Sequence, residues 1–255
     1  MECYFNEIID KSDEIKPYLP LVHTCDGYTF RDVIKTMILN VTKCDTFTDE
    51  KLLYTYYGKP TYRTSKETDA DSFRYNLPVV MILDYEKIRN SPKRVVALDS
   101  GAFVNGLFKD YMSPKMNVEG FMISEDISGA SRLVNYFYGS NRNYMNEHVK
   151  KDIEHDPLDF EIEAYFELIS NKRKSKFDNR KQSIEIQFEN PIDLYDSLMC
   201  IILPEVFLEN QLLSNLLRNN NIMYKKYEQE FQNPNQYYST LSSLTKEFLN
   251  EKEYL

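Results

Sequence analysis

Residues 21–37 read LVHTCDGYTFRDVIKTM and predict a short buried strand that leads directly into a helix. The first four residues, Leu21 to Thr24, are typical of a buried strand. After Tyr28, apolar residues recur at spacings of three and four, which places them on one face of a helix. We expect the Thr29 side chain to cap the first turn of that helix.

Strand and helix patterns are mixed along the rest of the chain without regular alternation. Strands are predicted at 52–57, 78–83, 94–98, 182–188, 198–203 and 222–224, and helices at 128–138, 144–155, 207–217 and 236–249. The segment 159–169 fits a helix or a strand equally well. The pattern therefore predicts the α+β class, with a mixed, largely antiparallel central sheet and flanking helices. We expect a single large domain over residues 1–255, with a candidate soft boundary near 156–180.

The chain has 255 residues and a formal net charge of −9. An acidic chain is repelled by phosphate backbones, which disfavours nucleic-acid binding as its main role. The basic run at 172–181 is interpreted as a solvated loop, with an anion-facing loop as the alternative. The longest apolar run, 77–83, has seven residues, far fewer than the roughly 20 needed to cross a bilayer. Because no secretory signal is visible either, we expect a cytoplasmic protein without membrane contact.

Several kinds of chemistry are disfavoured by missing motifs. The four cysteines, Cys3, Cys25, Cys44 and Cys200, form no CxxC pair and have no histidine at zinc spacing, so we expect free thiols and no metal site. The chain contains no phosphate-binding GxxxxGK[ST], dinucleotide-binding GxGxxG, HExxH or GxSxG motif.

Two polar groups in the first quarter are candidate site residues. His23 and Thr24 end a predicted strand, where binding groups are commonly presented. One nitrogen of such a histidine can bind a ribose hydroxyl while the backbone fixes the other. The stretch YTYYGKPTYR, residues 54–63, offers tyrosine rings for stacking and a guanidinium for a phosphate or carboxylate. The alternatives are a structural histidine and an aromatic strand that packs in the core.

Two further candidates lie later in the chain. On the strand 182–188, Glu185 and Gln187 share the face opposite Ile184 and Ile186, where a carboxylate could bind ribose and stabilise an oxocarbenium-like transition state. An exposed strand face is the structural alternative. The stretch Asp99-Ser100-Gly101 follows a buried strand and is interpreted as a tight turn in preference to an anion or metal site.

Taken together, a strand with His23-Thr24, a following helix, a tyrosine-rich segment and a late strand with Glu185 resemble the ADP-ribosyltransferase superfamily. Sites in that superfamily carry a His-Tyr-Glu or Arg-Ser-Glu triad on three strands. The first strand and helix look like those of the branch that modifies nucleic acids. The toxin-type pattern has Gln or Glu two residues before its glutamate, where this chain has Ser183.

The resemblance implies NAD as the substrate and assigns residue roles. Glu185 would be the transferase glutamate, and His23 would hold the nicotinamide ribose. A tyrosine of the cluster would stack on the nicotinamide. The remaining NAD-contacting residues would be Thr24, Tyr54, Tyr57, Tyr62, Arg63 and Gln187, with Tyr56 also a candidate for stacking.

These observations leave three candidate functions. The first is NAD-dependent transfer of ADP-ribose to a macromolecular acceptor, either protein or nucleic acid. The second is a non-catalytic nucleotide- or peptide-binding module, which would serve an intracellular interaction or antiviral defence system and bind a protein partner. The third is a nuclease that uses Asp99, Glu185 and a divalent metal; it is disfavoured because the chain lacks a nearby Glu-x-Lys or Asp-x-Lys strand.

Overall fold

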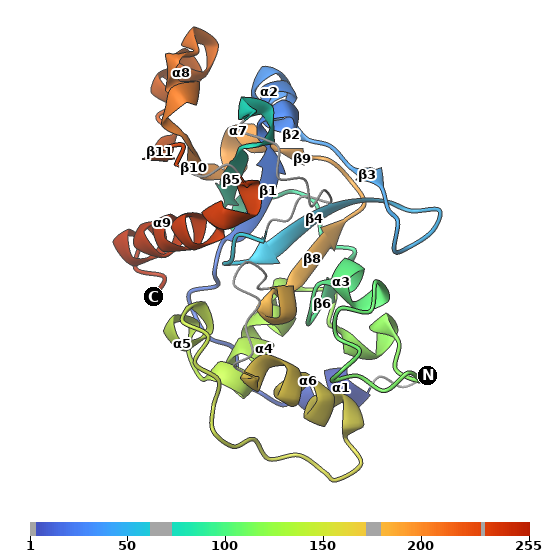
Figure 1. Cartoon of the computed structure of the whole chain (residues 1–255). Helices are drawn as coiled ribbons and strands as arrows, with labels where there is room; N and C mark the ends of the chain where they lie inside the picture. Colours follow the sequence, from blue (N-terminus) through green and yellow to red (C-terminus); the bar gives the residue numbers. More distant parts are fainter. Residues whose placement is uncertain (1–3, 62–72, 172–179, 231–232) are drawn as a thin grey trace.

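One sheet organises the chain, and strand β1 (Leu21–Asp26) lies in its middle (Figure 1). The computed structural model describes residues 4–61, 73–171, 180–230 and 233–255. Within them the strand order is β11-β10-β5-β1-β4-β8-β6-β7, and β3 pairs with the beginning of β4. These strands are β3 (Thr42–Lys43), β4 (Lys51–Tyr57), β5 (Pro78–Leu83), β6 (Arg94–Val96), β7 (Met122–Ile123), β8 (Glu185–Phe188), β10 (Leu198–Pro204) and β11 (Met223–Tyr227).

Neighbouring strands run antiparallel, except that β10 and β11 are parallel. A separate small sheet pairs β2 (Ile38–Leu39) with β9 (Ile192–Asp193). Helices flank the main sheet, so the predicted α+β class with a largely antiparallel sheet in a single domain is confirmed.

The sheet opens between β1 and β4. All six residues of β1 pair with β5, whereas only Leu21 and Val22 pair with β4, opposite Tyr57 and Tyr56. Beyond Val22 the two strands diverge, as Figure 1 shows. Backbone groups of β4 that face this gap are therefore free to bind side chains, which matters for the position of His23.

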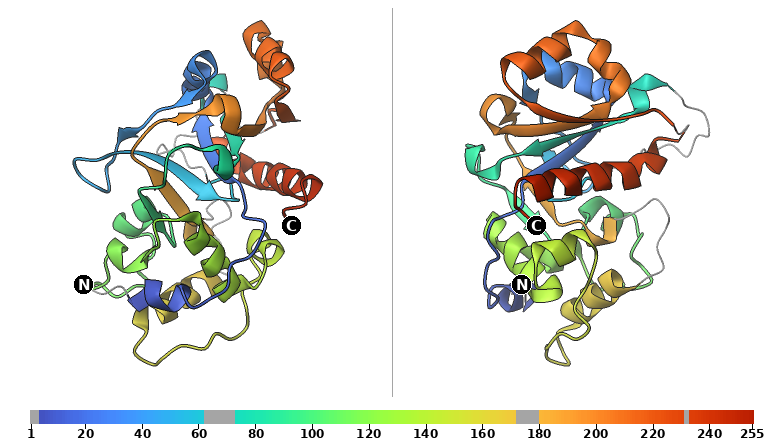
Figure 2. Two further views of the ribbon diagram at one scale, coloured as in Figure 1. Left: turned by 180° about the vertical axis from the view of Figure 1, so that it is seen from behind. Right: turned by 90° about the vertical axis from the view of Figure 1, so that its left-hand side faces the viewer.

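Helices gather at both ends of the sheet, as the views in Figures 1 and 2 agree. One group is α1 (Tyr4–Ile9), α4 (Ile127–Tyr138), α5 (Asn141–Met145) and α6 (Phe160–Ser170). At the opposite end lie α2 (Gly27–Thr36), α7 (Leu194–Ser197) and α8 (Gln211–Asn219), while α9 (Tyr238–Glu251) packs along β10 and α3 (Ser100–Val104) follows β6. None of the helices in the described part of the chain has the length and apolar character needed to cross a bilayer.

Aromatic side chains hold the first helix group onto the sheet. The Phe5 ring lies 5.6 Å from the rings of Phe121 and Tyr165, and the Phe137 ring lies 4.8 Å from that of Tyr165. All four side chains are at most 1% exposed. Edge-on contacts of this kind add to the large hydrophobic contribution of each buried ring.

The observed helices differ from two local predictions and decide a segment that the sequence left open. The α2 helix begins at Gly27, and the Asp26 carboxylate caps it by accepting from the Thr29 backbone N–H, so the capping side chain is that of Asp26 and not that of Thr29. The helix predicted over 144–155 is wrong, because α5 ends at Met145 and Glu147 adopts a left-handed φ of 59°. The ambiguous segment 159–169 forms helix α6.

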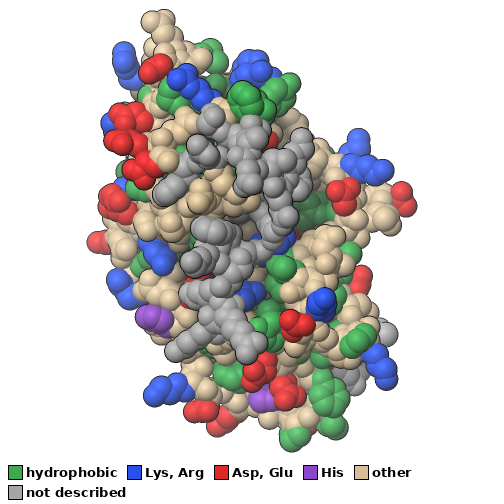
Figure 3. All heavy atoms as spheres, in the orientation of Figure 1, with side chains coloured by type: hydrophobic (Ala, Val, Ile, Leu, Met, Phe, Trp, Pro, Cys, Tyr) green, Lys and Arg blue, Asp and Glu red, His purple; other side chains and the backbone are tan. Residues whose placement is uncertain are grey.

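Acidic and basic side chains are mixed on the surface. On the face shown in Figure 3, Lys and Arg side chains lie among Asp and Glu side chains, and the described atoms form no continuous basic area there. Cys25, Cys44 and Cys200 are buried free thiols, as predicted, and Cys3 lies outside the described residues.

Candidate functional site

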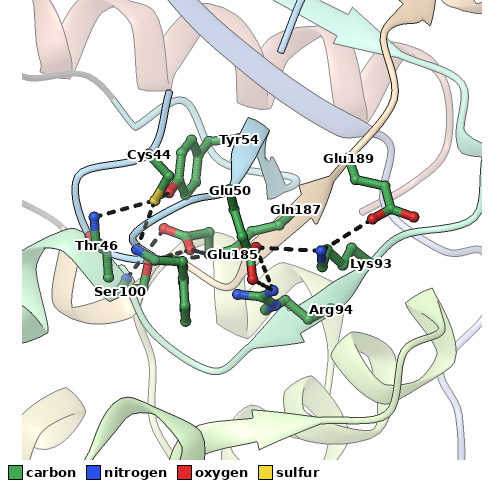
Figure 4. A network of polar contacts seen from close by, with 11 residues as sticks. Cys44, Thr46, Glu50, Tyr54, Lys93, Arg94, Ser100, Glu185, Gln187 and Glu189 are labelled. Carbon is green, nitrogen blue, oxygen red and sulfur yellow. Dashed lines mark hydrogen bonds and ion pairs between the residues drawn. The ribbon is translucent and has the colours of Figure 1, made fainter. Parts of the chain in front are cut away.

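Glu185 is a buried carboxyl group that accepts three hydrogen bonds (Figure 4). Its oxygens accept from the Ser100 backbone N–H at 3.2 Å and from the Ser100 hydroxyl at 2.7 Å. The amide of Gln187 donates to the same carboxyl group at 2.5 Å. Only 1% of Glu185 is exposed, so its environment is set by these neutral donors.

The alternation of β8 places this carboxyl group. Ile186 and Phe188 point into the core, while Glu185 and Gln187 share the other face of the strand. The predicted shared face is therefore present. The exposed-face alternative is wrong, because the turn between β6 and α3 covers Glu185 and brings Ser100 onto it.

Register brings tyrosines of β4 next to β8. Tyr56 lies opposite Glu185, and Tyr54 lies opposite Gln187. Directly opposed residues of antiparallel strands keep their side chains on one face, with Cβ atoms about 5 Å apart. Both tyrosines are partly exposed, so this face has access to solvent beside the buried acid.

Asp99 and Ser100 form the turn that the sequence indicates. The Asp99 carboxylate caps α3 by accepting from the Ala102 backbone N–H at 2.6 Å. Its second oxygen accepts from the Tyr56 hydroxyl at 3.0 Å. The contact between Ser100 and Glu185 was not expected from the sequence, in which the two residues lie 85 positions apart.

Burial raises the pKa of the Glu185 carboxyl group to about 8, and the negative charge of Asp99 acts in the same direction. The hydrogen bonds from Ser100 and Gln187 oppose this shift, but they do not overcome it. Burial also raises the pKa of Tyr54 and of Tyr56. These shifts favour the neutral forms of the carboxyl group and of both phenols.

The backbone fixes one nitrogen of His23, as predicted, but β1 continues to Asp26, so this residue lies within the strand and not at its end. Its Nδ1 lies 2.8 Å from the carbonyl oxygen of Tyr54, in the gap between β1 and β4. A carbonyl only accepts, so Nδ1 carries the proton and the other ring nitrogen of the neutral ring is an acceptor. Burial lowers the pKa of His23, which favours this neutral form.

The loop between β3 and β4 is fixed beside the tyrosines. The Cys44 sulfur lies 2.6 Å from the Tyr54 hydroxyl and accepts from the backbone N–H groups of Thr46 and Phe47. At the end of the loop, Glu50 accepts two hydrogen bonds from one terminal nitrogen of the Arg94 guanidinium, at 2.6 and 2.7 Å (Figure 4). These contacts fix the loop at both ends.

Lys93 places a second positive charge beside this ion pair. Lys93 lies 3.5 Å from Glu50 and 3.1 Å from Glu189, and both contacts are partly exposed. Arg94 and Lys93 thus pair with carboxylates outside the buried face. Among the described residues, no lysine or arginine side chain donates a hydrogen bond to Glu185.

The other predicted ligand-binding residues are placed as follows. Tyr57 is fully buried on the opposite face of β4, and its hydroxyl accepts from the Leu19 backbone N–H, a place that favours a structural role. Tyr62 and Arg63 lie outside the described residues. Thr24 is adjacent to His23, and its buried hydroxyl has no hydrogen-bond partner within the described part of the chain.

Gln187 also leaves one polar atom unsatisfied. Its side-chain oxygen is buried and has no partner among the described residues. Buried polar groups in proteins are nearly always hydrogen-bonded, so such an atom beside Glu185 points to a donor from a ligand or water. Across the described ranges, no group of three His, Cys, Asp or Glu side chains is arranged to hold a metal ion.

No model of a known protein family and no curated protein sequence matches this chain. The functional argument therefore depends on the geometry of the site. In that geometry, three adjacent strands carry a backbone-fixed neutral imidazole (β1), two tyrosines (β4) and a buried titratable carboxyl group (β8). Such a set can bind hydroxyl groups and stabilise positive charge.

Proposed function

We propose that this protein transfers ADP-ribose from NAD to a macromolecular acceptor, with Glu185 as the central acidic residue. The observation that supports the proposal is the adjacency of β1, β4 and β8, the strands that carry His23, Tyr54 with Tyr56, and Glu185, together with the contact of the His23 ring with the backbone of Tyr54. This is the chain order and strand arrangement that the His-Tyr-Glu resemblance implies.

The reaction breaks the bond between the ribose C1′ and the nicotinamide nitrogen, and nicotinamide leaves with the bonding electrons. The acceptor heteroatom forms the new bond to C1′ and loses a proton. Positive charge develops on the ribose between these events. An ionised Glu185 would stabilise that charge and accept from a ribose hydroxyl, at the place where electrostatic preorganisation contributes most.

His23 and the tyrosines would position the substrate. The free nitrogen of the neutral His23 ring accepts hydrogen bonds and suits a ribose hydroxyl. Tyr54 and Tyr56 offer partly exposed rings for stacking on a heteroaromatic group. Correct positioning of this kind can supply several kcal/mol, on the order of 7 or more in favourable cases, of the barrier reduction.

The test is nicotinamide release, measured by mass spectrometry after the purified chain is incubated with NAD and a cell extract. Glu185→Gln should abolish release, whereas Glu163→Gln, the same substitution at an exposed position on α6, should not change it. Equal release by wild type and Glu185→Gln would contradict the proposal. The labelled molecule in the extract would identify the acceptor.

A non-catalytic nucleotide- or peptide-binding module is the second candidate. It is favoured by the three hydrogen bonds that Glu185 accepts, which would suit a structural acid equally well. This function predicts saturable ligand binding without any product. It also predicts that Glu185→Gln leaves the affinity unchanged.

A further inference from the structure

A hollow of about 250 Å³ lies between α2, α8 and two 3₁₀ helices, η1 (Arg74–Asn76) and η5 (Glu205–Glu209). Figures 1 and 2 place α2 and α8 at the same end of the sheet. Most of the described side chains that line the hollow are apolar: Phe30, Ile34, Val206, Phe207 and Leu213. None of them belongs to the site around Glu185, so the hollow is a separate feature of the fold.

Three of the surrounding elements meet at Gly27, the first residue of α2. A side chain at this position would place its Cβ atom 2.8 Å from the carbonyl oxygen of Arg74 and 2.7 Å from the Phe207 ring. Glycine therefore allows η1 and η5 to approach the start of α2 closely. The Phe30 ring stacks on the Phe207 ring at 6.4 Å, and Phe30 is buried. Contacts within the protein thus fix the walls of the hollow before any ligand binds.

The edge of the hollow carries exposed aromatic rings. Tyr75 lines the hollow and is 48% exposed, and Phe73, close to it in the chain, is 55% exposed. The two rings stack at 5.3 Å with an angle of 13° between their planes. Leu212, beside the lining residue Leu213, is also exposed. Exposed aromatic and apolar side chains around an apolar hollow are typical of a surface that binds another protein.

The charged side chains among the described lining residues are two arginines. Arg31 lies on α2 and Arg74 lies on η1, and both are exposed. Arg31 already pairs with Asp32 at 3.3 Å and lies over the Tyr28 ring. Within the described ranges, the Arg74 side chain forms no ion pair. Because a planar guanidinium matches the geometry of a carboxylate, this hollow favours an acidic occupant, although the whole chain carries a net charge of −9.

We propose that this hollow binds an acidic segment of a partner protein, which inserts one large apolar side chain between α2 and α8 and places a carboxylate on Arg74. The inference goes beyond the proposed function and does not depend on it, because it uses no residue of the site around Glu185. The volume is below the range of about 300–1,000 Å³ that is typical of small-molecule sites, which favours a single inserted side chain. Two arginines are few for a nucleic-acid backbone, which requires many cationic contacts.

Fluorescence anisotropy with three labelled peptides of equal length tests the chemistry of the occupant. The first peptide has a central Phe-Leu pair between aspartates and glutamates. The second has the same pair between lysines and arginines, and the third keeps the acidic flanks but has two central alanines. We expect the full chain to bind the first peptide roughly tenfold more tightly than either of the others, since both the apolar anchor and the charge are recognised.

Variants of exposed residues locate the binding. Arg74→Glu should weaken the first peptide roughly tenfold, because attraction of its carboxylates becomes repulsion. Tyr75→Ala should weaken it roughly fivefold through loss of the ring. The matched controls are Arg89→Glu and Tyr195→Ala, which change exposed residues that do not line the hollow and should bind like the wild type. Circular dichroism checks that every variant is folded.

Several results would overturn the inference. They are equal binding of the three peptides, no saturable binding of the first peptide, and an affinity that Arg74→Glu and Tyr75→Ala leave unchanged. A labelled oligothymidine that binds more tightly than the first peptide and is released by Arg74→Glu would show that the hollow binds nucleic acid instead. Self-association in sedimentation velocity that Tyr75→Ala abolishes would show that a second copy of the chain occupies it. Nicotinamide release measures the proposed function separately from all these outcomes.

Discussion

The stability of the Glu185→Gln variant relative to the wild type should increase with pH. In the folded state the pKa of this carboxyl group is raised from 4.5 to about 8. The folded state therefore binds more protons than the unfolded state between these values, and the free energy of unfolding falls as pH rises through that interval. Well above pH 8 the carboxyl group is ionised in both states, so the free energy of unfolding does not fall further.

The magnitude follows from the shift. The rise in pKa from 4.5 to about 8 corresponds to about 5 kcal/mol at high pH and to about 3 kcal/mol at pH 7. Glutamine has the same shape and no ionisable proton. Its single oxygen can replace only one of the two carboxyl oxygens that accept from Ser100, and the resulting cost is the same at every pH. The variant should therefore avoid this loss of stability.

Urea denaturation followed by circular dichroism at pH 5, 6, 7 and 8 measures the effect. The stability difference between Glu185→Gln and wild type should grow by about 3 kcal/mol from pH 5 to pH 8. Glu163→Gln, at an exposed position, should follow the wild type throughout. A difference between Glu185→Gln and wild type that stays constant with pH would refute the reasoning, because it would mean that Glu185 titrates normally in the folded protein.

Three further predictions concern neighbouring groups. Ser100→Ala removes the hydroxyl that donates to Glu185 at 2.7 Å, so it should destabilise the protein by about 1–2 kcal/mol. Because that hydrogen bond lowers the pKa of Glu185, its loss should move the pH interval over which stability falls to higher pH, as measured by the same urea series. The pKa of His23 should lie below the ordinary histidine value of 6.5, because burial disfavours the charged ring, and a His23 NMR signal, assigned with His23→Asn, that titrates at or above 6.5 would contradict this. Arg94→Met should cost about 1–3 kcal/mol, because Glu50 loses its paired donors, and unchanged thermal stability would show that the ion pair contributes nothing.

Local sequence patterns predicted most of the elements near the site. Alternation at 182–188 correctly placed Glu185 and Gln187 on one face of a strand. The backbone fixes one nitrogen of His23, as predicted, but the predicted strand end at Thr24 was wrong because β1 continues to Asp26. The helix over 144–155 was wrong because helical spacing alone does not show where a chain turns, and here Glu147 takes a left-handed conformation.

The contacts that define the site were beyond the reach of such patterns. Ser100 follows a buried strand in an Asp-Ser-Gly turn, and this turn signal gives no information about which distant strand it will cover. The same applies to the tyrosines. Their spacing on β4 alone does not show which faces the acid, and it is the pairing with β8 that puts Tyr54 and Tyr56 beside Glu185 and leaves Tyr57 in the core.

The sequence by itself determined the α+β class, the strand that carries Glu185 and the strand that carries His23, because these depend on periodicities within a few residues. Only the tertiary structure decided that Glu185 is buried, that its pKa is raised and that Asp99 contributes to this shift. Burial and charge coupling arise when segments about 85 residues apart meet, and the pKa of a carboxyl group depends on that environment rather than on its neighbours in the chain.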